Sequence, residues 1–412
     1  MTEPSSASKD TGIGTLRAVI TVMVVAHHAL LAYHPFAPPP FPSLRTAPLW
    51  QAFPVVDPDR WQGALWLVAL NDTFFMSLMF LISGLFVWRS LTAKGGARHL
   101  RDRARRLGLP FLFGAALLAP LAYLPSYLQT GAIATWSGFW REWLALETWP
   151  AGPAWFLWVL LAFNLLATVL YLLSRRWGEH LGKLFTGAAH RPFLAFAIVL
   201  VASAAAYVPI TLAYGPLTWS AIGPFAVQTS RAIHYFVYFL VGVAVGAAGL
   251  ERGLVAQAGK LAARWPRWVI GAAIAFGFAI VAAARDFASG GARIWQLLDA
   301  LGFVLACAAL CFAFLAVFVR AAPFHSRILA SLRDNAYAIY VIHYAIVSWL
   351  QYALLDAALP GVAKACLAFG GAVTLSWIIA AGLRRLARIV SRAPRITTAV
   401  ELRTQPADQP VA

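Results

Sequence analysis

The stretch at residues 17–34, RAVITVMVVAHHALLAYH, decides the class of protein. It is apolar enough to enter a bilayer, yet it begins with Arg17 and carries the adjacent histidines His27 and His28 near its middle. Ionisable side chains are costly inside a membrane helix and are kept there when they face a cavity or a partner. The stretch therefore predicts a transmembrane helix with a functional polar face.

The composition of the whole chain agrees with a membrane protein. Of its 412 residues, 61% are hydrophobic and only 12% are charged, with a mean hydropathy of +0.70. Soluble domains are about half apolar and about a quarter charged. The formal net charge of +17 comes from short basic runs between apolar blocks, which is the pattern of a multi-span membrane protein and not of a nucleic-acid-binding surface. We therefore expect membrane lipids, and no nucleic acid, as partners.

The apolar blocks predict an all-α polytopic membrane protein with about ten transmembrane helices. A span needs about 20 apolar residues. The first block has no small-residue cleavage site, so we expect it to be retained as a span. The ten blocks are residues 13–34, 64–90, 107–128, 152–174, 193–213, 231–250, 268–284, 295–319, 336–357 and 362–383.

The basic residues predict how these spans are oriented. If the N-terminus lies inside, all but seven of the 33 lysines and arginines fall in cytoplasmic segments or at the inner ends of spans. Such a bias predicts that both termini are cytoplasmic. We expect a cytoplasmic tail at 1–12, one membrane domain at 13–384, and a basic tail at 385–412 that is disordered from 393. The seven outer basic residues are Arg45, Arg60, Arg141, Arg231, Arg285, Arg293 and Lys364.

Two predicted outer segments are rich in aromatic residues. Residues 35–63 combine prolines with aromatic side chains, and residues 129–151 contain four tryptophans, namely Trp136, Trp140, Trp143 and Trp149. Tryptophans commonly anchor spans at the membrane interface. They could also form a platform for a ring-shaped ligand such as a sugar, and the sequence leaves both interpretations open.

The three cysteines, Cys307, Cys311 and Cys366, all lie in apolar runs. Cys307 and Cys311 share a helix face, but no histidine or acidic residue lies beside them in the sequence, as a metal site would require. We expect packing residues, with no disulfide framework and no metal.

Arg17 and His28 lie on one face of the first span. Eleven residues, close to three turns, separate them, whereas His27 points about 100° away from His28. The axial separation of Arg17 and His28 is about 16 Å at 1.5 Å per residue. Arg17 alone would be explained by snorkelling to the interface, but His28 is too deep for that. His28 and Arg17 are therefore the candidate catalytic residues.

A second deep histidine, His343, occurs in NAYAIYVIHYAIV, about 15 Å inside the ninth predicted span. Its predicted depth is close to that of His28. The two imidazoles could line one cavity, or His343 could simply bond a neighbouring helix. Both possibilities remain open from the sequence.

Four motifs occur together in a fixed order. They are the Arg17–His28 pair, Phe-x-x-Ser-Gly ending in Ser83 and Gly84, Arg-x-x-Arg at Arg103 and Arg106, and a late Tyr-x-x-His at Tyr340 and His343. In this combination the chain resembles the membrane-bound acyltransferase 3 family. Trp155, in the Trp-Phe-Leu of residues 155–157, and the long outer segment resemble the branch that modifies periplasmic glucans. Many relatives have an acidic residue just before Phe-x-x-Ser-Gly, where this chain has Ser77.

The resemblance implies transfer of an acyl group, acetyl or succinyl first, from cytoplasmic acyl-CoA to a hydroxyl of an extracytoplasmic carbohydrate. It implies a multi-pass protein of the bacterial inner membrane that uses acyl-CoA as donor and no metal. His28 suits a base or acyl carrier, because neutral imidazole works near pH 7. The basic segment 98–106 is expected to form a cytoplasmic loop between the second and third spans. Its Arg101, Arg103 and Arg106 are candidate contacts for the donor's phosphates, because arginine binds phosphate bidentately. His343, Ser83 and Trp155 are candidates for the substrate cavity.

The main alternative is a transporter or flippase for a glycan or lipid-linked substrate, since transporters also place polar groups at mid-bilayer. Proton-coupled transport usually needs intramembrane carboxylates. Here the candidates are Asp72 and Asp299, for which the sequence shows no network. The oligomeric state is not indicated by the sequence.

Overall fold

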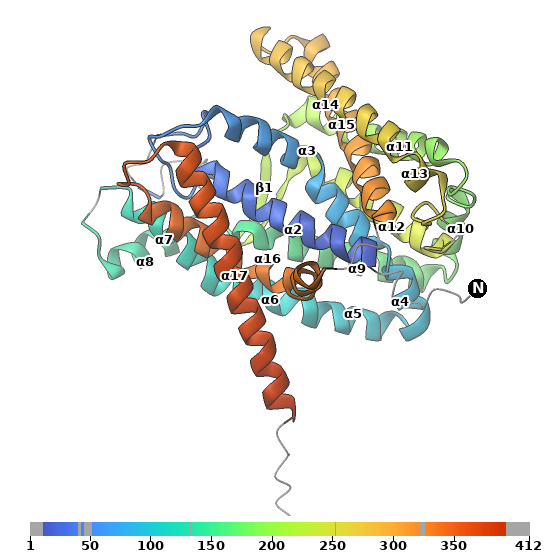
Figure 1. Cartoon of the computed structure of the whole chain (residues 1–412), viewed down its shortest axis with the longest axis horizontal. Coiled ribbons are helices and arrows are strands. Elements are labelled where there is room, and N and C mark those ends of the chain that lie inside the picture. The colour runs from blue at the N-terminus through green and yellow to red at the C-terminus, as the bar shows by residue number, and fades with distance from the viewer. Residues whose placement is uncertain are drawn as a thin grey trace, which may run out of the picture.

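The computed structural model describes residues 11–39, 43–44, 52–131, 133–251, 253–321 and 326–392. Long helices make up most of it, with one short antiparallel hairpin, β1–β2, in which Trp219 pairs with Gln228 and Ile222 with Phe225 (Figure 1). The elements are α2 (Thr11–Leu31), α3 (Gln62–Gly84), α4 (Val87–Lys94), α5 (Gly96–Arg103), η1 (Ala104–Gly108), α6 (Leu109–Phe113), η2 (Gly114–Leu118), α7 (Ala119–Leu128), α8 (Trp136–Leu144), η3 (Gly152–Ala154), α9 (Trp155–Leu173), α10 (Trp177–Leu184), α11 (Pro192–Tyr214), β1 (Trp219–Ile222), β2 (Phe225–Gln228), η4 (Thr229–Arg231), α12 (Ala232–Ala248), α13 (Lys260–Ala263), α14 (Trp265–Ala288), α15 (Arg293–Arg320), α16 (Arg327–Ala353) and α17 (Gly361–Arg392).

The predicted fold class, an all-α polytopic membrane protein, is confirmed. Each of the ten predicted spans coincides with a long helix, and in the part of the chain described here nine helices are long and apolar enough to cross a membrane. The tenth, α16, has 27 residues but carries several polar side chains. It packs against α2, α7 and α17, and its Asn335, His343, Ser348 and Gln351 are buried. Neighbouring helices rather than lipid therefore surround its polar face, as the cost of polar groups in hydrocarbon requires.

The first span, α2, lies at the centre of this arrangement. It contacts α3, α15, α16 and α17, with α17 crossing in front of it in Figure 1. We call the end of the bundle where α2 begins the arginine end, because Arg17 lies there, and the opposite end the strap end. The helix is regular over Thr11–Leu31, so the predicted spacing of Arg17 and His28 along one helix holds.

The sequence prediction was wrong about the basic segment at 98–106. This segment was expected to be a loop before a span at 107–128, but it is helical, and one helical run continues over Gly96–Leu128. The chain turns at Gly95, whose φ of 76° favours glycine. Two π-helical segments, η1 and η2, interrupt the run, and such segments often occur at functional sites. The arginines are therefore held on a rigid element rather than on a loop.

The glycine of the Phe-x-x-Ser-Gly motif has a packing role. A Cβ on Gly84 would lie 2.2 Å from the carbonyl oxygen of Phe239, and one on Gly242 would lie 2.0 Å from that of Leu81. Helices α3 and α12 therefore meet backbone to backbone, as small residues allow in membrane proteins. This close approach explains the glycine without assigning it any chemistry.

The predicted tails are described only in part. Residues 385–392 were expected to belong to the basic tail beyond the last span, but α17 continues through Arg392, and its last turns extend away from the other helices (Figure 1). An apolar series at Leu383, Leu386 and Ile389 continues the span pattern there, which explains the extension. Residues 1–10 and 393–412 lie outside the described residues.

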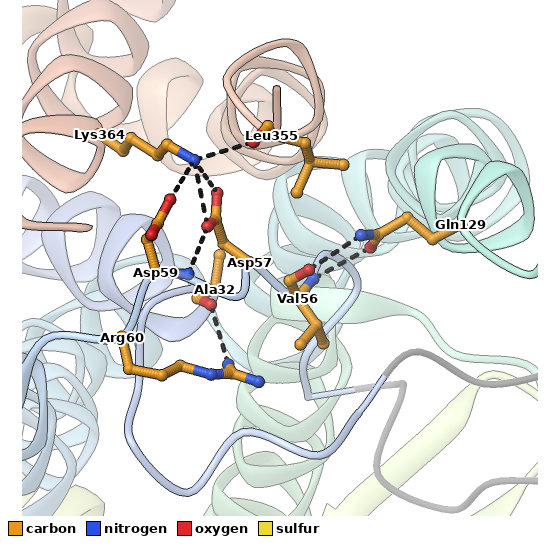
Figure 2. Close-up of polar contacts among 8 residues, drawn as sticks. All are labelled: Ala32, Val56, Asp57, Asp59, Arg60, Gln129, Leu355 and Lys364. Carbon is orange, nitrogen blue, oxygen red and sulfur yellow. Dashed lines mark hydrogen bonds and ion pairs between the residues drawn. The ribbon is translucent and has the colours of Figure 1, made fainter. Parts of the chain in front are cut away.

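At the strap end, residues 54–61 are bonded across the last turn of α2, and we call this segment the strap. The amide of Asp57 donates to the carbonyl of Ala32 (3.0 Å), and that of Trp61 donates to the carbonyl of Tyr33 (2.9 Å). Gln129, at the end of α7, makes two bonds to the backbone of Val56 (Figure 2). Burial and the nearby Asp57 carboxylate raise the pKa of the Tyr33 hydroxyl, which therefore stays protonated. The strap is an ordered part of the fold.

Candidate active site

Two histidines, separated by 315 residues in the sequence, meet at the interface of α2 and α16. His343 Nε2 lies 3.1 Å from His28 Nδ1, and the ring centroids are 5.1 Å apart. His343 is fully buried, whereas His28 is partly accessible. The structure thus brings together the two imidazoles that the sequence placed at similar depth.

Hydrogen bonds assign the tautomers of this pair. His343 Nδ1 lies 2.6 Å from the carbonyl oxygen of Tyr340, to which it must donate, so its Nε2 is an acceptor. His28 Nδ1 therefore carries a proton, which it shares between His343 Nε2 and the carbonyl oxygen of Val24 at 2.9 Å. The lone pair of His28 then lies on Nε2. The arrangement leaves His28 Nε2 as the free basic atom of the pair.

A pocket adjoins the imidazoles. Tyr344 packs edge-on against the ring of His28, with centroids 4.8 Å apart, and also lines this pocket together with Tyr340. The hydroxyl of Tyr340 donates to the carbonyl of Pro153, and that of Tyr344 lies 3.3 Å from the hydroxyl of Tyr123. The other lining residues are Gly114, Leu118, Ala119, Ala151, Pro153, Ala154, Leu157 and Val341. The pocket is thus small and largely apolar, and Tyr344 links it to the ring of His28.

Side chains from three elements gather at the arginine end of α16. A Cβ on Gly14 of α2 would lie 3.3 Å from Cδ of Arg333, so the start of α2 lies against α16. One turn further along α16, the hydroxyl of Tyr337 donates to the carbonyl of Arg106 at 2.5 Å. Pro110 cannot supply the usual helical bond to that carbonyl because it has no N–H. We call residues 98–106 the arginine segment. It lies at the same end of the bundle as Arg17, which is one turn beyond Gly14.

The predicted donor-binding arginines are accessible at this end. Arg17, Arg101 and Arg106 are exposed, and Arg103 is partly buried. Lys94 and Asp102 form an exposed ion pair of 2.6 Å between α4 and α5. Asp102, the acid within the segment, is thus paired with a lysine outside it. The arginines remain available for an anionic ligand.

Ser83 is not brought to the imidazoles. The side chain of Asn71 in α3 donates to the carbonyl of Met23 in α2, so these two residues lie at the same height along their helices. Ser83 lies twelve residues further along α3, in the direction away from His28. At 1.5 Å per residue its axial separation from His28 is roughly 25 Å.

Trp155 points toward an aromatic group beside the pocket. Its ring stacks on Tyr235 at 5.8 Å and meets Trp219 of the hairpin edge-on at 6.0 Å. The neighbouring Phe156 contacts the ring of Tyr340 at 5.8 Å. Trp155 thus lies one residue away from the pocket wall, with its side chain directed at the hairpin.

The four tryptophans of residues 129–151 differ in exposure. Trp143 is buried against Tyr123 and Phe139, whereas Trp136 is 66% exposed. Trp140 and Trp149 pack on the same cluster while partly accessible. Trp143 is therefore a packing residue, and only Trp136 presents much of its ring outward.

The sequence analysis missed two contacts because their partners lie far apart in the chain. His234 Nε2 of α12 lies 3.6 Å from Cys307 Sγ, so a histidine does sit beside this cysteine, contrary to the sequence pattern. Asp72, expected to lack a network, forms a bidentate ion pair with Arg231, at 2.6 Å and 2.9 Å. Within the described residues, no group of three His, Cys, Asp or Glu side chains is placed to hold a metal ion.

The comparisons with known proteins settle which family this arrangement represents. The model of a family described as an acyltransferase domain matches residues 10–381, which include both histidines, the pocket and the arginine segment. The chain belongs to the acyltransferase 3 family. No curated protein and no solved structure matches it. The acyltransferase domain covers all ten long helices almost completely, so the chain is a multi-pass membrane protein of this family.

Proposed function

We propose that this acyltransferase moves an acetyl or succinyl group from cytoplasmic acyl-CoA to a hydroxyl of an extracytoplasmic carbohydrate, such as a periplasmic glucan. The charge distribution of the sequence supports cytoplasmic termini, and the resemblance to proteins that modify periplasmic glucans supports the bacterial inner membrane. The observation that carries the proposal is the His28–His343 pair beside the tyrosine-lined pocket. The carboxylate Asp72 is bound to Arg231 in this structure, which counts against a free proton relay of the kind that a transporter needs.

His28 supplies the base of the reaction. In direct transfer, the acceptor hydroxyl attacks the thioester carbonyl while its proton passes to His28 Nε2. The bond between the carbonyl carbon and sulfur then breaks, and the CoA thiolate takes up a proton as it leaves. His343 accepts the Nδ1 proton of His28 in a hydrogen bond and so holds the ring in the reactive tautomer. If His28 Nε2 instead attacks the thioester first, the bond between the carbonyl carbon and sulfur breaks and CoA leaves as a thiolate. The acceptor hydroxyl then attacks the acyl carbon, the bond to Nε2 breaks, and the proton released from the hydroxyl balances the one that the thiolate takes up from water.

The donor approaches from the arginine end. Its 3′-phosphate and pyrophosphate suit Arg101, Arg103 and Arg106, while Arg17 lies between these arginines and His28. The axial distance of about 16 Å from Arg17 to His28 is one that the extended pantetheine arm of CoA spans. In this arrangement the phosphates stay at the bundle end while the thioester reaches the imidazole.

The proposed activity is tested by incubating the purified, detergent-solubilised protein with a panel of acyl-CoAs. We expect free CoA to be released from acetyl-CoA or succinyl-CoA, and the release to rise when a linear glucose oligosaccharide is added. The covalent product is measured by mass spectrometry of the oligosaccharide. Absence of CoA release from every donor, with and without oligosaccharide, contradicts the proposal.

The arginine segment is tested by exchanging arginine for lysine. Arg103→Lys and Arg106→Lys together keep the charge but remove the planar fork, so we expect the Kd for acyl-CoA to rise about tenfold. The matched control is Arg175→Lys with Arg176→Lys, two exposed arginines that follow the end of α9. Both proteins are titrated at one fixed salt concentration. Equal affinity in wild type and both variants would show that the segment is basic for topology alone.

A further inference from the structure

The strap is held by a buried ion cluster centred on Lys364. Lys364 Nζ donates to both carboxylate oxygens of Asp57 (3.2 and 3.0 Å), to Asp59 Oδ2 (2.8 Å) and to the carbonyl of Leu355 (2.9 Å) (Figure 2). The side chains of Lys364 and Asp57 are both 0% exposed, while that of Asp59 is 49% exposed. A buried charge of this kind is retained only when it is paired and hydrogen-bonded.

The backbone of the strap and the start of α17 approach each other closely beside Lys364. Gly361 begins α17, and a Cβ there would lie 2.3 Å from the carbonyl oxygen of Asp59. The amide of Asp59 donates to Asp57 Oδ1 at 2.8 Å, which folds the two carboxylates toward one point. The start of α17 and the strap are therefore in direct backbone contact, with Lys364 spanning them.

The strap in turn contacts the segment that follows His28. Ala32, one turn after His28, accepts from the amide of Asp57 and from the guanidinium of Arg60 (3.3 Å). From α16, the side chain of Gln351 donates to the carbonyl oxygens of His28 (2.9 Å) and Ala29 (3.1 Å). The end of α2 that carries the proposed base is thus bonded by α16 on one side and by the strap on the other.

We propose that Lys364 is a positioning residue for acyl transfer, whose ion cluster fixes the strap as the wall against which the carbohydrate acceptor meets His28. The inference rests on the proposed function, since it assigns the strap end to the acceptor. The strap end lies opposite the arginines, and there the strap exposes the carboxylate of Asp59 beside the partly accessible Arg60, whose guanidinium also donates to the carbonyls of Ala32 and His34. Carboxylate and guanidinium groups accept from and donate to sugar hydroxyls.

The order of the strap is measured first, by hydrogen–deuterium exchange of the purified protein. Lys364→Met removes the charge, and we expect exchange of the amides in 56–61 to become about tenfold faster, because the buried carboxylates lose their partner. Lys94→Met is the matched control, since it breaks the exposed Lys94–Asp102 pair at the other end of the bundle. Asp59→Asn, which removes only the half-exposed partner, is expected to give a smaller acceleration and covers the case in which Lys364→Met does not fold. Unchanged exchange of 56–61 in the folded variants overturns the proposal.

Steady-state kinetics then separate positioning from general stability. In the CoA-release assay with a linear glucose oligosaccharide, we expect Asp59→Asn and Lys364→Met to raise the KM for the oligosaccharide at least fivefold, while the KM for acetyl-CoA stays within twofold of wild type. If exchange of 56–61 is faster but the KM for the oligosaccharide is unchanged, the cluster only stabilises the fold and the positioning role is rejected. If wild-type protein releases no CoA, the proposed function fails and the positioning role fails with it, while the exchange experiment still decides whether Lys364 orders the strap.

Discussion

His28→Ala should lower acyl transfer by about 10³-fold or more, because it removes the atom that accepts the proton or carries the acyl group. Membrane insertion and elution of the purified protein should stay near those of wild type, since His28 is partly accessible. The measurement is CoA release at saturating donor.

The matched control for this prediction is the adjacent histidine. His27 packs against Phe75 of α3 at 5.2 Å and points away from His343. His27→Ala should therefore keep activity within about tenfold of wild type, the loss reflecting packing alone. An inactive His27 variant together with an active His28 variant would show that the reactive face of α2 has been assigned to the wrong histidine.

His343→Phe should lower kcat by about 10²-fold while leaving the affinity for acyl-CoA unchanged. Phenylalanine retains an aromatic ring at this buried position but offers no acceptor to His28 Nδ1. The proton on His28 Nδ1 then depends on the Val24 carbonyl alone, and the lone pair is no longer held on Nε2. Single-turnover rates and donor titrations separate the two effects.

Tyr123→Phe serves as the matched control for His343→Phe. It removes a hydroxyl that lies 3.3 Å from the hydroxyl of Tyr344, in the same region, without touching either imidazole. We expect a change in kcat of less than about threefold. Equal losses in the two variants would mean that the site tolerates no substitution, and His343 would have no special role.

The arginine segment is one place where the sequence prediction was wrong about local structure. Charge and hydropathy placed it between two spans and suggested a loop, because basic residues are unfavourable in a bilayer. The segment is instead part of the helical run Gly96–Leu128, because Gly95 supplies the turn directly before α5 and the chain then stays helical through η1 and η2. Hydropathy reports where a helix can be buried in lipid, not where it begins.

Local patterns in the sequence determined the class of fold, the positions of the long helices and the common face of Arg17 and His28, because these depend on the composition and periodicity of single segments. Only the tertiary structure decided that His28 bonds to His343, that Lys364 is buried with Asp57 and also pairs with Asp59, and that Asp72 pairs with Arg231. Each of these contacts joins residues far apart in the chain. They depend on how helices rotate and pack against one another, for which the periodicity of one helix contains no information.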